Sequence, residues 1–578
     1  MHVSLDQALG RQPRLNRVGQ SLLNIGSGAS AAYSLRSLTG GDPKVVNVRR
    51  DADDEEREFT ASGVNSELEN WVNGKLETTL PADVASAAAA YSLRKVRSAY
   101  TGNAVQIRRT SDNVEVDVAF DANGEVSTSS AITNVTEETS GSSEGSTTAT
   151  TLGDFISGTD AAVVTWYDQS GNGEDATQLT SGDQPLLAES GSLLTSTNGK
   201  VAIDLRRTSS SDGPFLLASS VSGLVGSLSM FTLVDFDETG SPLSLSNSTA
   251  GNRYFAINEG STTHQVISRN TTTVTVSDTV TGNERIGFGV TTGQTSTKSS
   301  VDGGSLVEDT TDYGDDFGAG DLDQILIGAL RTVSPTSHFD GHIQELLVYT
   351  SDQSSNRFKI ESNINNHYDN ANYDDTRDGF VETWFDQSGN DNDATDATSG
   401  TLDDQPQIVS SGSLIVDSNS NPTLEFDGDV LTFTDIVMDA DAFSVFAFAD
   451  SDSENSFNEI VGKDGTNHRI AIYRSLNGER AAVNLAGSGN WFPNPGNFQD
   501  NDKVSIHTFL KDATNTNWYV DGTNRGTDSS GDTTDTTFDE IGKGRTGVIS
   551  EVIIYKDIDK SSDRTLIEGN MNNYYESF

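Results

Sequence analysis

The chain has 578 residues, enough for several domains that each have their own core. Its apolar share of 34% is low, and Gly, Ser, Thr, Asp and Asn are abundant, so short strands joined by polar turns fit the composition better than helical packing does. The formal net charge of −49 disfavours binding to nucleic acid or to anionic membranes, because both require a cationic surface.

Three features that the sequence lacks narrow the class of protein further. There is no cysteine, so disulfides play no part and the redox compartment stays open. No segment has the unbroken apolar length of a membrane span, so no membrane insertion is expected. Residues 1–6 lack the charged start and apolar middle of a secretion signal, so we expect release by lysis or by another route if the protein acts outside a cell.

The first segment, residues 1–24, is basic on a very acidic chain. It contains Arg11, Arg14 and Arg17, and Pro13 argues against one continuous helix. The segment is predicted to be an anchor that docks on a partner. The alternative is a frayed terminus.

A Tyr-Ser-Leu-Arg motif then occurs twice, at residues 33–36 and 91–94, and each copy precedes a strand-like run that ends in Arg-Arg. The first copy has no obvious later partner motif. It therefore predicts a truncated repeat module over residues 25–80.

A longer motif divides the rest of the chain. Residues 164–177 recur as residues 382–395 without a gap, with Trp166 and Trp384 at the same position in each copy. The elements that follow also correspond, for example residues 201–204 with 424–427. The repeat predicts a first domain over residues 81–370, with a flexible insertion at about 125–151, and a second over residues 371–578.

Each of these two domains reads as a series of short strands with Gly-rich turns and one closing helix. An Asp-Gly hairpin turn recurs at Asp302 and Asp521, and each domain ends in an apolar strand before the helix. This pattern predicts an all-β fold of two-sheet β-sandwiches in tandem, preceded by the anchor and the truncated repeat.

The motifs resemble those of known families. The closing pattern resembles the end of laminin-G-like, concanavalin-A-type jelly rolls. Residues 91–112 and 166–173 resemble the amino-terminal part of the catalytic jelly roll of alpha-L-arabinofuranosidase B. They resemble still more closely modules in tail and virion proteins of marine bacteriophages, and the resemblance covers most of residues 25–578.

The chain departs from the arabinofuranosidase pattern where catalysis is concerned. The adjacent cysteine pair of those enzymes is missing, and no catalytic carboxylate motif is found. Residues 115–117 begin like a Glu-x-Asp-x-x-Glu glycanase strand, but Phe120 stands in the last Glu position. Because glycoside hydrolysis needs paired carboxylates at a set separation, we expect a protein that is not an enzyme.

The loop after each tryptophan carries oxygen side chains at alternating positions, as the first half of a calcium loop does. The predicted calcium ligands are Asp168, Ser170, Asn172 and Asp175 in the first copy and Asp386, Ser388, Asn390 and Asp393 in the second. The alternative is a polar turn in which Asp and Asn side chains bond to the backbone. No other cofactor is expected.

Aromatic residues are the candidates for sugar contacts. Trp166 and Trp384 follow apolar strands and are expected in the core. Trp491 lies among turn-forming residues, so Trp491, Asn490 and Asn494 are the predicted glycan-binding residues. Glu345 and Glu551 occupy equivalent places between apolar neighbours, where a structural role is favoured over a catalytic one.

Together these features predict a bacteriophage virion protein of the tail, a fibre or another external appendage, exposed on the particle exterior. Residues 1–24 would attach it to other virion proteins, and lectin-like jelly rolls would bind host-surface glycans or neighbouring subunits. The alternatives are a purely structural decoration or connector without sugar binding, and an arabinofuranosidase-like glycoside hydrolase. A homotrimer is expected by analogy with phage fibres.

Overall fold

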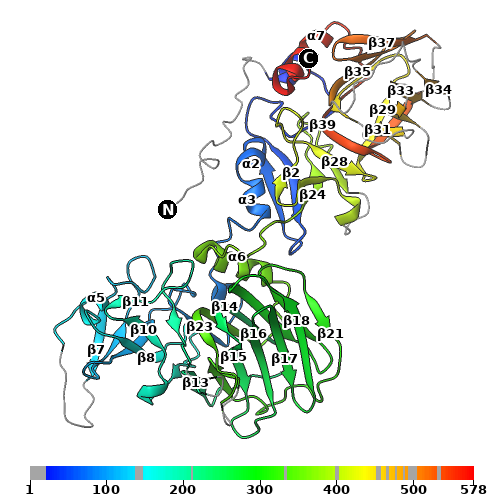
Figure 1. The fold of residues 1–578 in the computed structure, drawn as a ribbon. Helices are drawn as coiled ribbons and strands as arrows, with labels where there is room; N and C mark the ends of the chain where they lie inside the picture. The colour runs from blue at the N-terminus through cyan, green and yellow to red at the C-terminus, as the bar shows by residue number, and fades with distance from the viewer. Residues whose placement is uncertain are drawn as a thin grey trace. The chain divides into compact units, whose positions relative to one another are not determined.

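The chain forms two compact units in a computed structural model (Figure 1). Unit 1 combines Met1–Asn73 with Thr376–Phe578, and unit 2 is Gly74–Asp375. The structure describes residues 21–136, 147–207, 209, 212–330, 335–396, 402–450, 457–463, 466, 468–475, 478–485, 488–491, 504–529 and 535–578.

Unit 2 is built from antiparallel strands. Its strands are β4 (Ala89–Ser92), β5 (Val105–Arg109), β6 (Glu115–Val118), β7 (Ile132–Thr136), β8 (Ala161–Trp166), β9 (Ala176–Thr177), β10 (Leu186–Glu189), β11 (Ser192–Leu193), β12 (Ile203–Asp204), β13 (Leu216–Ser219), β14 (Leu228–Glu238), β15 (Gly240–Ser246), β16 (Tyr254–Gly260), β17 (Thr263–Arg269), β18 (Thr273–Thr279), β19 (Glu284–Thr291), β20 (Thr297–Val301), β21 (Val307–Asp309), β22 (Gln324–Ile327) and β23 (Asp340–Tyr349). Its helices are α4 (Pro81–Val84), α5 (Leu152–Phe155), the 3-10 turn η1 (Ser181–Asp183) and α6 (Arg357–Tyr368).

Unit 1 repeats this order of elements. Its strands are β1 (Ala31–Ser34), β2 (Lys44–Arg50), β3 (Glu56–Thr60), β24 (Gly379–Trp384), β25 (Ala394–Asp396), β26 (Gln407–Ser410), β27 (Ser413–Leu414), β28 (Leu424–Asp427), β29 (Leu431–Met438), β30 (Phe443–Ala449), β31 (Phe457–Gly462), β32 (Arg469–Ser475), β33 (Gly478–Leu485), β34 (Ser488–Trp491), β35 (Ser505–Lys511), β36 (Thr516–Val520), β37 (Thr523–Asp528), β38 (Thr536–Ile541) and β39 (Thr546–Lys556). Its helices are α1 (Leu22–Ile25), α2 (Ala61–Ser66), α3 (Leu68–Val72), the 3-10 turn η2 (Leu402–Asp404) and α7 (Arg564–Tyr575).

Most strand pairings of the two units match; among the described residues, the pairing of β7 with β6 is found in unit 2 alone. In unit 2, β14 lies between β19 and β23, and β23 also pairs with β4 and β12. In unit 1, β30 lies between β35 and β39, and β39 also pairs with β1 and β28. Both units are therefore all-β jelly rolls of the concanavalin-A-like type, and the predicted fold class is confirmed.

The prediction of a truncated module over residues 25–80 was wrong. The strand at Ala31–Ser34 pairs with β39, the last strand of the chain, and β2 pairs with β24. In Figure 1 the blue β2 and α3 lie beside the yellow β24 and β28. Residues 21–73 are thus the opening strands of the second jelly roll, and unit 2 is inserted into that jelly roll after α3.

The two ends of the insertion lie side by side in unit 1. The Asn73 side chain donates a hydrogen bond to the Gly412 carbonyl oxygen at 2.7 Å and accepts one from the Arg377 backbone N–H at 3.1 Å. One buried amide therefore holds the chain where it leaves unit 1 and where it returns. The expected domain limits of 81–370 and 371–578 are replaced by 74–375 and a discontinuous unit.

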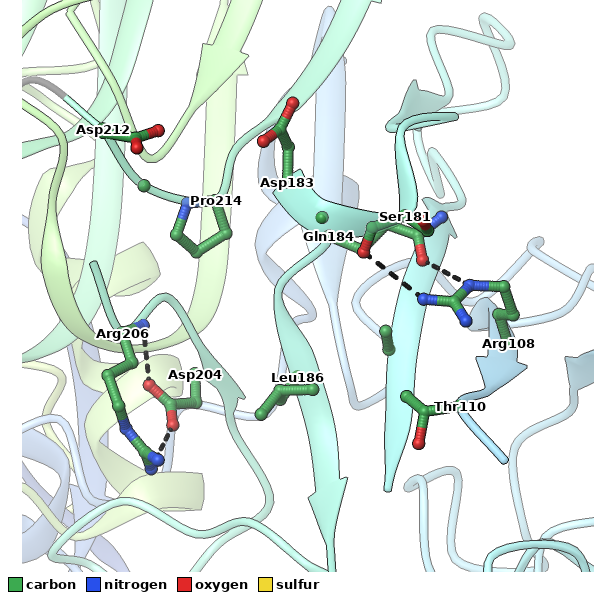
Figure 2. A pocket seen from close by; sticks show the side chains of 13 residues that line it. Arg108, Thr110, Ser181, Asp183, Gln184, Leu186, Asp204, Arg206, Asp212 and Pro214 are labelled. Atoms are coloured by element: carbon green, nitrogen blue, oxygen red, sulfur yellow. Dashed lines mark hydrogen bonds and ion pairs between the residues drawn. The ribbon is translucent and has the colours of Figure 1, made fainter. Parts of the chain in front are cut away.

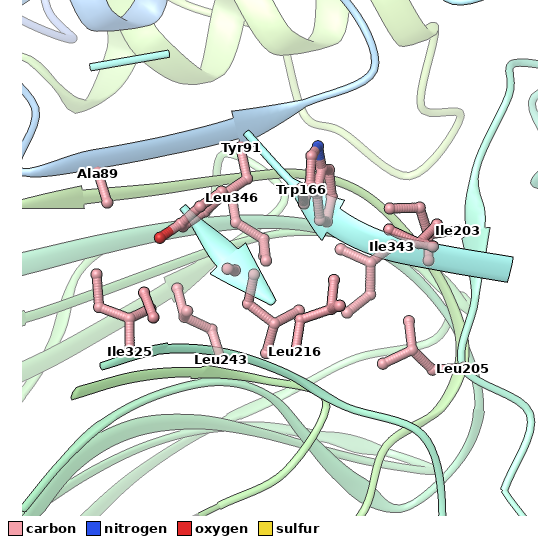
Figure 3. Packing of buried hydrophobic residues seen from close by; sticks show 14 of the residues in the cluster. Ala89, Tyr91, Trp166, Ile203, Leu205, Leu216, Leu243, Ile325, Ile343 and Leu346 are labelled. Carbon is pink, nitrogen blue, oxygen red and sulfur yellow. The ribbon is translucent and has the colours of Figure 1, made fainter. Parts of the chain in front are cut away.

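The long central strands are buried because both of their faces are covered. In unit 2 the inward side chains surround Trp166, as Figure 3 shows for Tyr91, Ile343 and Leu346. The opposite face of β14, β19 and β23 packs against α6. A strand covered on both sides has no exposed face, which explains why β14 is buried without a break from Leu228 to Phe236.

The structure describes parts of the predicted anchor, residues 1–24, and of the predicted flexible insertion, residues 125–151. Of the predicted anchor, residues 1–20 lie outside the described residues, whereas Leu22 is buried in a cluster with residues of α7. Within the predicted flexible insertion, β7 pairs with β6, and residues 137–146 lie outside the described residues. In the described part of the chain, no helix is long and apolar enough to cross a membrane.

Candidate functional site

The loop after Trp166 binds the Tyr-Ser-Leu-Arg strand through Asp168 and Gln169, which are both buried. Asp168 accepts hydrogen bonds from the backbone N–H of Ala90 at 2.9 Å and of Ser170 at 2.8 Å. Its second oxygen accepts from the Ser170 hydroxyl at 2.5 Å and from the Gly173 N–H at 3.1 Å. The Asp168 carboxylate is therefore satisfied by donors of its own loop and of β4.

Gln169 completes the contact between the loop and the strand. Its amide donates to the Ser92 and Arg94 carbonyl oxygens, each at 2.9 Å, and its oxygen accepts from the Val96 N–H at 3.0 Å. The Tyr91 ring lies 5.9 Å from that of Trp166, and both side chains are fully buried. We call this set of contacts the signature clasp of unit 2.

Unit 1 has the same clasp across a much longer sequence separation. Asp386 accepts from the Ala32 N–H at 2.8 Å. The Gln387 amide donates to the Ser34 and Arg36 carbonyl oxygens at 3.0 Å and 2.9 Å. The first Tyr-Ser-Leu-Arg motif therefore belongs to the second tryptophan motif, and the second to the first.

Glu345 in unit 2 and Glu551 in unit 1 each bind the Ser and Arg side chains of the Tyr-Ser-Leu-Arg motif in their own unit. Arg94 donates two hydrogen bonds to Glu345, at 2.8 and 3.0 Å, and the Ser92 hydroxyl donates a third at 3.0 Å. Arg36 binds Glu551 in the same bidentate way, at 2.7 and 2.9 Å. Both glutamates are buried and paired, so the expected structural role fits the geometry.

The eight oxygen side chains predicted to bind calcium serve as clasp groups. They bond to backbone N–H and carbonyl groups, as the polar-turn alternative predicts. In the residues that the structure describes, no group of three or more His, Cys, Asp or Glu side chains could hold a metal ion. Calcium binding stays a prediction, which thermal unfolding in calcium and in a chelator would test.

The predicted glycan contact around Trp491 falls at the edge of the described residues. Asn490 and Trp491 belong to β34, opposite Val483 and Ala482 of β33, instead of a loop of turn formers. Asn494 lies outside the described residues. This glycan site stays a prediction. Trp166 and Trp384 are fully buried, which confirms that they are core residues.

A separate pocket of about 380 Å³ lies in unit 2 beside β10 and β12 (Figure 2). This volume is within the range of roughly 300–1,000 Å³ that is usual for small-ligand sites. Its charged lining groups are Arg108, Arg206, Asp183, Asp204 and Asp212. We call it the Arg206 pocket.

One wall of the pocket is formed by Arg206 and Asp204. The Arg206 guanidinium donates to Asp204 at 2.8 Å and to Glu189 at 3.2 Å, yet its side chain remains 57% exposed. Asp204 also accepts from the Arg206 backbone N–H at 2.9 Å. Burial raises the pKa of the Asp204 carboxyl, against the opposing charge of Arg206.

The opposite wall contains Arg108, which is only 7% exposed. Its guanidinium donates to Gln184 and to Asn113, each at 2.8 Å, and to the Ser181 carbonyl oxygen at 3.3 Å. These neutral partners hold Arg108 and the η1 turn together. Arg206 is therefore the exposed cation of the pocket, and Arg108 is a supporting one.

Apolar groups and an acid complete the pocket. Figure 2 shows Leu186 and Pro214 among the lining residues, with Asp183 beside Pro214. Among the described residues, none donates a hydrogen bond to the Asp183 carboxylate. The pocket thus offers hydrogen-bond donors, acceptors and apolar surface within one small volume.

Unit 1 has different side chains at the matching positions. Asp204 pairs with His342, and Glu425 pairs with Val548 at the equivalent place of the second jelly roll. Asp204 therefore matches Glu425, and Arg206 matches Asp427. The sequence comparison, which placed 204 opposite 427, was shifted by two residues. Unit 1 has an acid where unit 2 has its exposed arginine.

Sequence reasoning missed this pocket. Its lining comes from β5, η1, β10 and the segment after β12, which are far apart in the sequence and carry no shared motif. The departure at Arg206, in an otherwise repeated pattern, was the available signal. The two-residue shift in the comparison concealed it.

Several solved structures are similar to parts of this chain. No family model matches the chain, and no curated protein matches it. A GH54 α-L-arabinofuranosidase has a TM-score of 0.36 at 14% identity, covering 75% of this chain and 99% of that one. Domain 4 of a GH43 extracellular arabinanase from Geobacillus stearothermophilus has a TM-score of 0.26 at 14% identity, over 32% and 91%. The CBM40 of a Ruminococcus gnavus sialidase has a TM-score of 0.21 at 16% identity, over 24% and 84%.

These likenesses agree with a jelly-roll fold that carbohydrate-binding domains also have, and none of them supports a bacteriophage or tail protein. The prediction that the protein is not an enzyme is contradicted, because glycoside hydrolases are among the similar structures. At these TM-scores the likeness assigns no activity to this chain.

Proposed function

We propose that this protein binds carbohydrate and that the Arg206 pocket of unit 2 holds a sugar residue of the ligand. The observation that carries the proposal is the pocket itself, in which an exposed guanidinium, carboxylates and small apolar surfaces line one volume of about 380 Å³. This combination matches the chemistry of a saccharide, which has hydroxyl groups around its edge and C–H groups on its faces.

The individual contacts can be assigned by chemical type. Sugar hydroxyls donate to the carboxylate of Asp183 and accept from the remaining N–H groups of Arg206. The C–H face packs on Leu186 or Pro214. Hydrogen bonds to charged groups contribute about 1.5–3 kcal/mol each, so two or three of them supply most of a weak sugar affinity.

The test is a glycan array probed with the full-length protein and with Arg206→Ala. Arg253→Ala is the matched control, because Arg253 lies in the same unit, is 39% exposed and also pairs with an aspartate. We expect binding to be lost in Arg206→Ala and kept in Arg253→Ala. Binding that survives in Arg206→Ala, or is absent from the intact protein, would overturn the proposal.

The same samples decide whether bound sugars are also cleaved. Chromatography of the glycans after incubation detects released arabinose or oligosaccharides. A product that disappears in Arg206→Ala would assign a hydrolase reaction to this pocket. A product that persists in that variant would place cleavage at another site.

We further propose that the protein is a bacteriophage virion component on the exterior of the particle, attached through residues 1–24 and assembled as a homo-oligomer. The sequence resemblance of the two motifs and the net charge of −49, which suits a dispersed soluble surface, support this assignment. Mass spectrometry of purified particles tests it, and absence of the chain from them would refute it. Light scattering of the pure protein tests the trimer.

A further inference from the structure

The Arg206 pocket has more negative than positive side chains, and this excess affects which saccharides it can bind. Three carboxylates, of Asp183, Asp204 and Asp212, face two guanidinium groups. Arg108 is buried and its donors are directed at protein acceptors. Arg206 already pairs with Asp204 and Glu189. Arg206 is thus matched by two carboxylates, and Arg108 is directed at neutral protein acceptors. Because the lining carboxylates outnumber the guanidinium groups, the pocket has no excess positive charge for a ligand.

We infer that the Arg206 pocket selects neutral saccharides and rejects those with a carboxylate or sulfate, and that Asp183 determines this selection. The inference rests on the proposed function and deepens it by naming the ligand class. Because the Asp183 carboxylate has no hydrogen-bond donor among the described residues, it acts as an acceptor for ligand hydroxyls and as a full negative charge toward an anion.

Electrostatics gives the size of the effect. Two like charges about 6 Å apart, at an effective dielectric constant of about 20, repel strongly enough to weaken binding by about 100-fold, and a partly screened pair still weakens it by about tenfold. A hydroxyl at the same place donates to the carboxylate and gains affinity instead. The net charge of −49 acts in the same direction at longer range.

The repeat supplies a natural comparison for this inference. Asp427 of unit 1 stands where unit 2 has Arg206, and Gln407 stands where it has Leu186. Unit 1 therefore lacks both the exposed donor and the apolar surface that the sugar contact requires. Arg206→Asp introduces the unit 1 residue at this position and is expected to abolish saccharide binding.

The experiment uses the full-length protein and matched sugars that differ only in charge: neutral galacto-oligosaccharides, oligogalacturonates and sulfated galacto-oligosaccharides, on one array and in solution competition. We expect the neutral form of a bound sugar to bind at least about tenfold more tightly than its uronate or sulfate. Asp183→Asn should reduce this ratio at least about fivefold by improving anion binding. Asp315→Asn, an exposed aspartate of the same unit, is the control and should leave the ratio unchanged.

The outcomes separate the two proposals. Tighter binding of the anionic forms, or a ratio that Asp183→Asn does not alter, overturns the charge selection while Arg206-dependent binding stands. Binding that does not depend on Arg206, or no binding to any sugar, overturns the proposed function itself. Thermal unfolding of each variant shows whether the fold is intact, and Asp183 is partly exposed, so Asp183→Asn is expected to fold.

Discussion

The two units share one fold but are assembled differently along the chain. Unit 2 is continuous, whereas unit 1 joins residues 21–73 to residues that follow the whole of unit 2. The clasp spans 77 residues from Ser92 to Gln169 in unit 2 and 353 residues from Ser34 to Gln387 in unit 1. The contacts are nevertheless the same.

The physics of loop closure explains why the insertion is tolerated. The entropy cost of closing a loop rises with the logarithm of its length, so the longer span of unit 1 costs only about 1 kcal/mol more than that of unit 2. The buried ion pair and the three hydrogen bonds of the glutamine exceed this difference. The comparison shows that the clasp specifies the jelly roll and that chain continuity is not required.

The largest expected effect comes from breaking the buried ion pair of one unit. Glu345→Gln leaves the Arg94 guanidinium buried without its counter-charge and should destabilise unit 2 by about 3–5 kcal/mol. Glu551→Gln should do the same to unit 1. Hydrogen exchange followed by mass spectrometry measures each unit separately.

The control for this pair is Glu308→Gln, an exposed glutamate that should have little effect. If either glutamate variant weakened both units equally, the two clasps would not be independent. That result would contradict the conclusion that each unit is held together by its own contacts.

The second effect in size concerns the glutamine of the clasp. Gln169→Ala removes three hydrogen bonds and should cost about 2–3 kcal/mol in unit 2. Gln387→Ala should cost a similar amount in unit 1. It should also expose residues 31–36 to proteolysis, because β1 would then be held mainly by its pairing with β39. Limited proteolysis and chemical denaturation measure the two effects, and protection of residues 31–36 in Gln387→Ala would count against the clasp.

A pH effect on stability is expected in unit 2. Glu284 is buried beside Asp235 on the adjacent strand, and burial raises its pKa to about 7, with Asp235 adding to the rise. The folded state therefore holds the proton of the Glu284 carboxyl more tightly than the unfolded state does. The resulting stabilisation of the fold is complete below a pH of about 4.3, the ordinary pKa of Glu, and is lost as the pH rises through about 7. Unit 2 should therefore lose on the order of 2 kcal/mol of stability between pH 5 and pH 8.

Glu284→Gln should flatten this dependence, and thermal unfolding across the pH range measures it. Asp302, whose pKa burial also raises to about 7, should retain part of the slope. An unchanged slope in Glu284→Gln would show that Glu284 is not responsible.

The smallest effect lies in the clasp loop itself. Gly173 has φ +78°, and its counterpart Asp391 adopts φ +54°. A Cβ at Gly173 would meet no atom within 4 Å, so Gly173→Asp should cost only the backbone strain of about 1 kcal/mol. A loss above about 3 kcal/mol in denaturant unfolding would mean that the loop is packed more tightly than its counterpart.

Much of the fold follows from the sequence because the repeats are local and long. The strand pattern, the core position of Trp166 and the structural role of Glu345 could all be predicted from short segments. The nesting could not, because each Tyr-Ser-Leu-Arg strand was matched to what followed it directly. Two copies of each motif, in the order strand, strand, loop, loop, were the missed signal.

The Arg206 pocket was beyond such reasoning for a physical reason. Its side chains converge only after β5, β10 and β12 have paired, and each of them is ordinary in its own segment. Arg206 stays more than half exposed despite its two carboxylate partners, and no described residue donates a hydrogen bond to the Asp183 carboxylate; a sequence reveals neither property. The predicted calcium ligands show the opposite error. Their spacing in the sequence fits a calcium loop, but in the structure these side chains form hydrogen bonds with backbone groups.

The most direct test of the nested arrangement is the unfolding of residues 74–375 produced alone. Trp166 is the only tryptophan of this segment, so its fluorescence reports the unit 2 core without interference. We expect a buried, blue-shifted emission and a single cooperative thermal transition within about 5 °C of the one that unit 2 shows in the full chain. A solvent-exposed emission without a cooperative transition would contradict the nested arrangement.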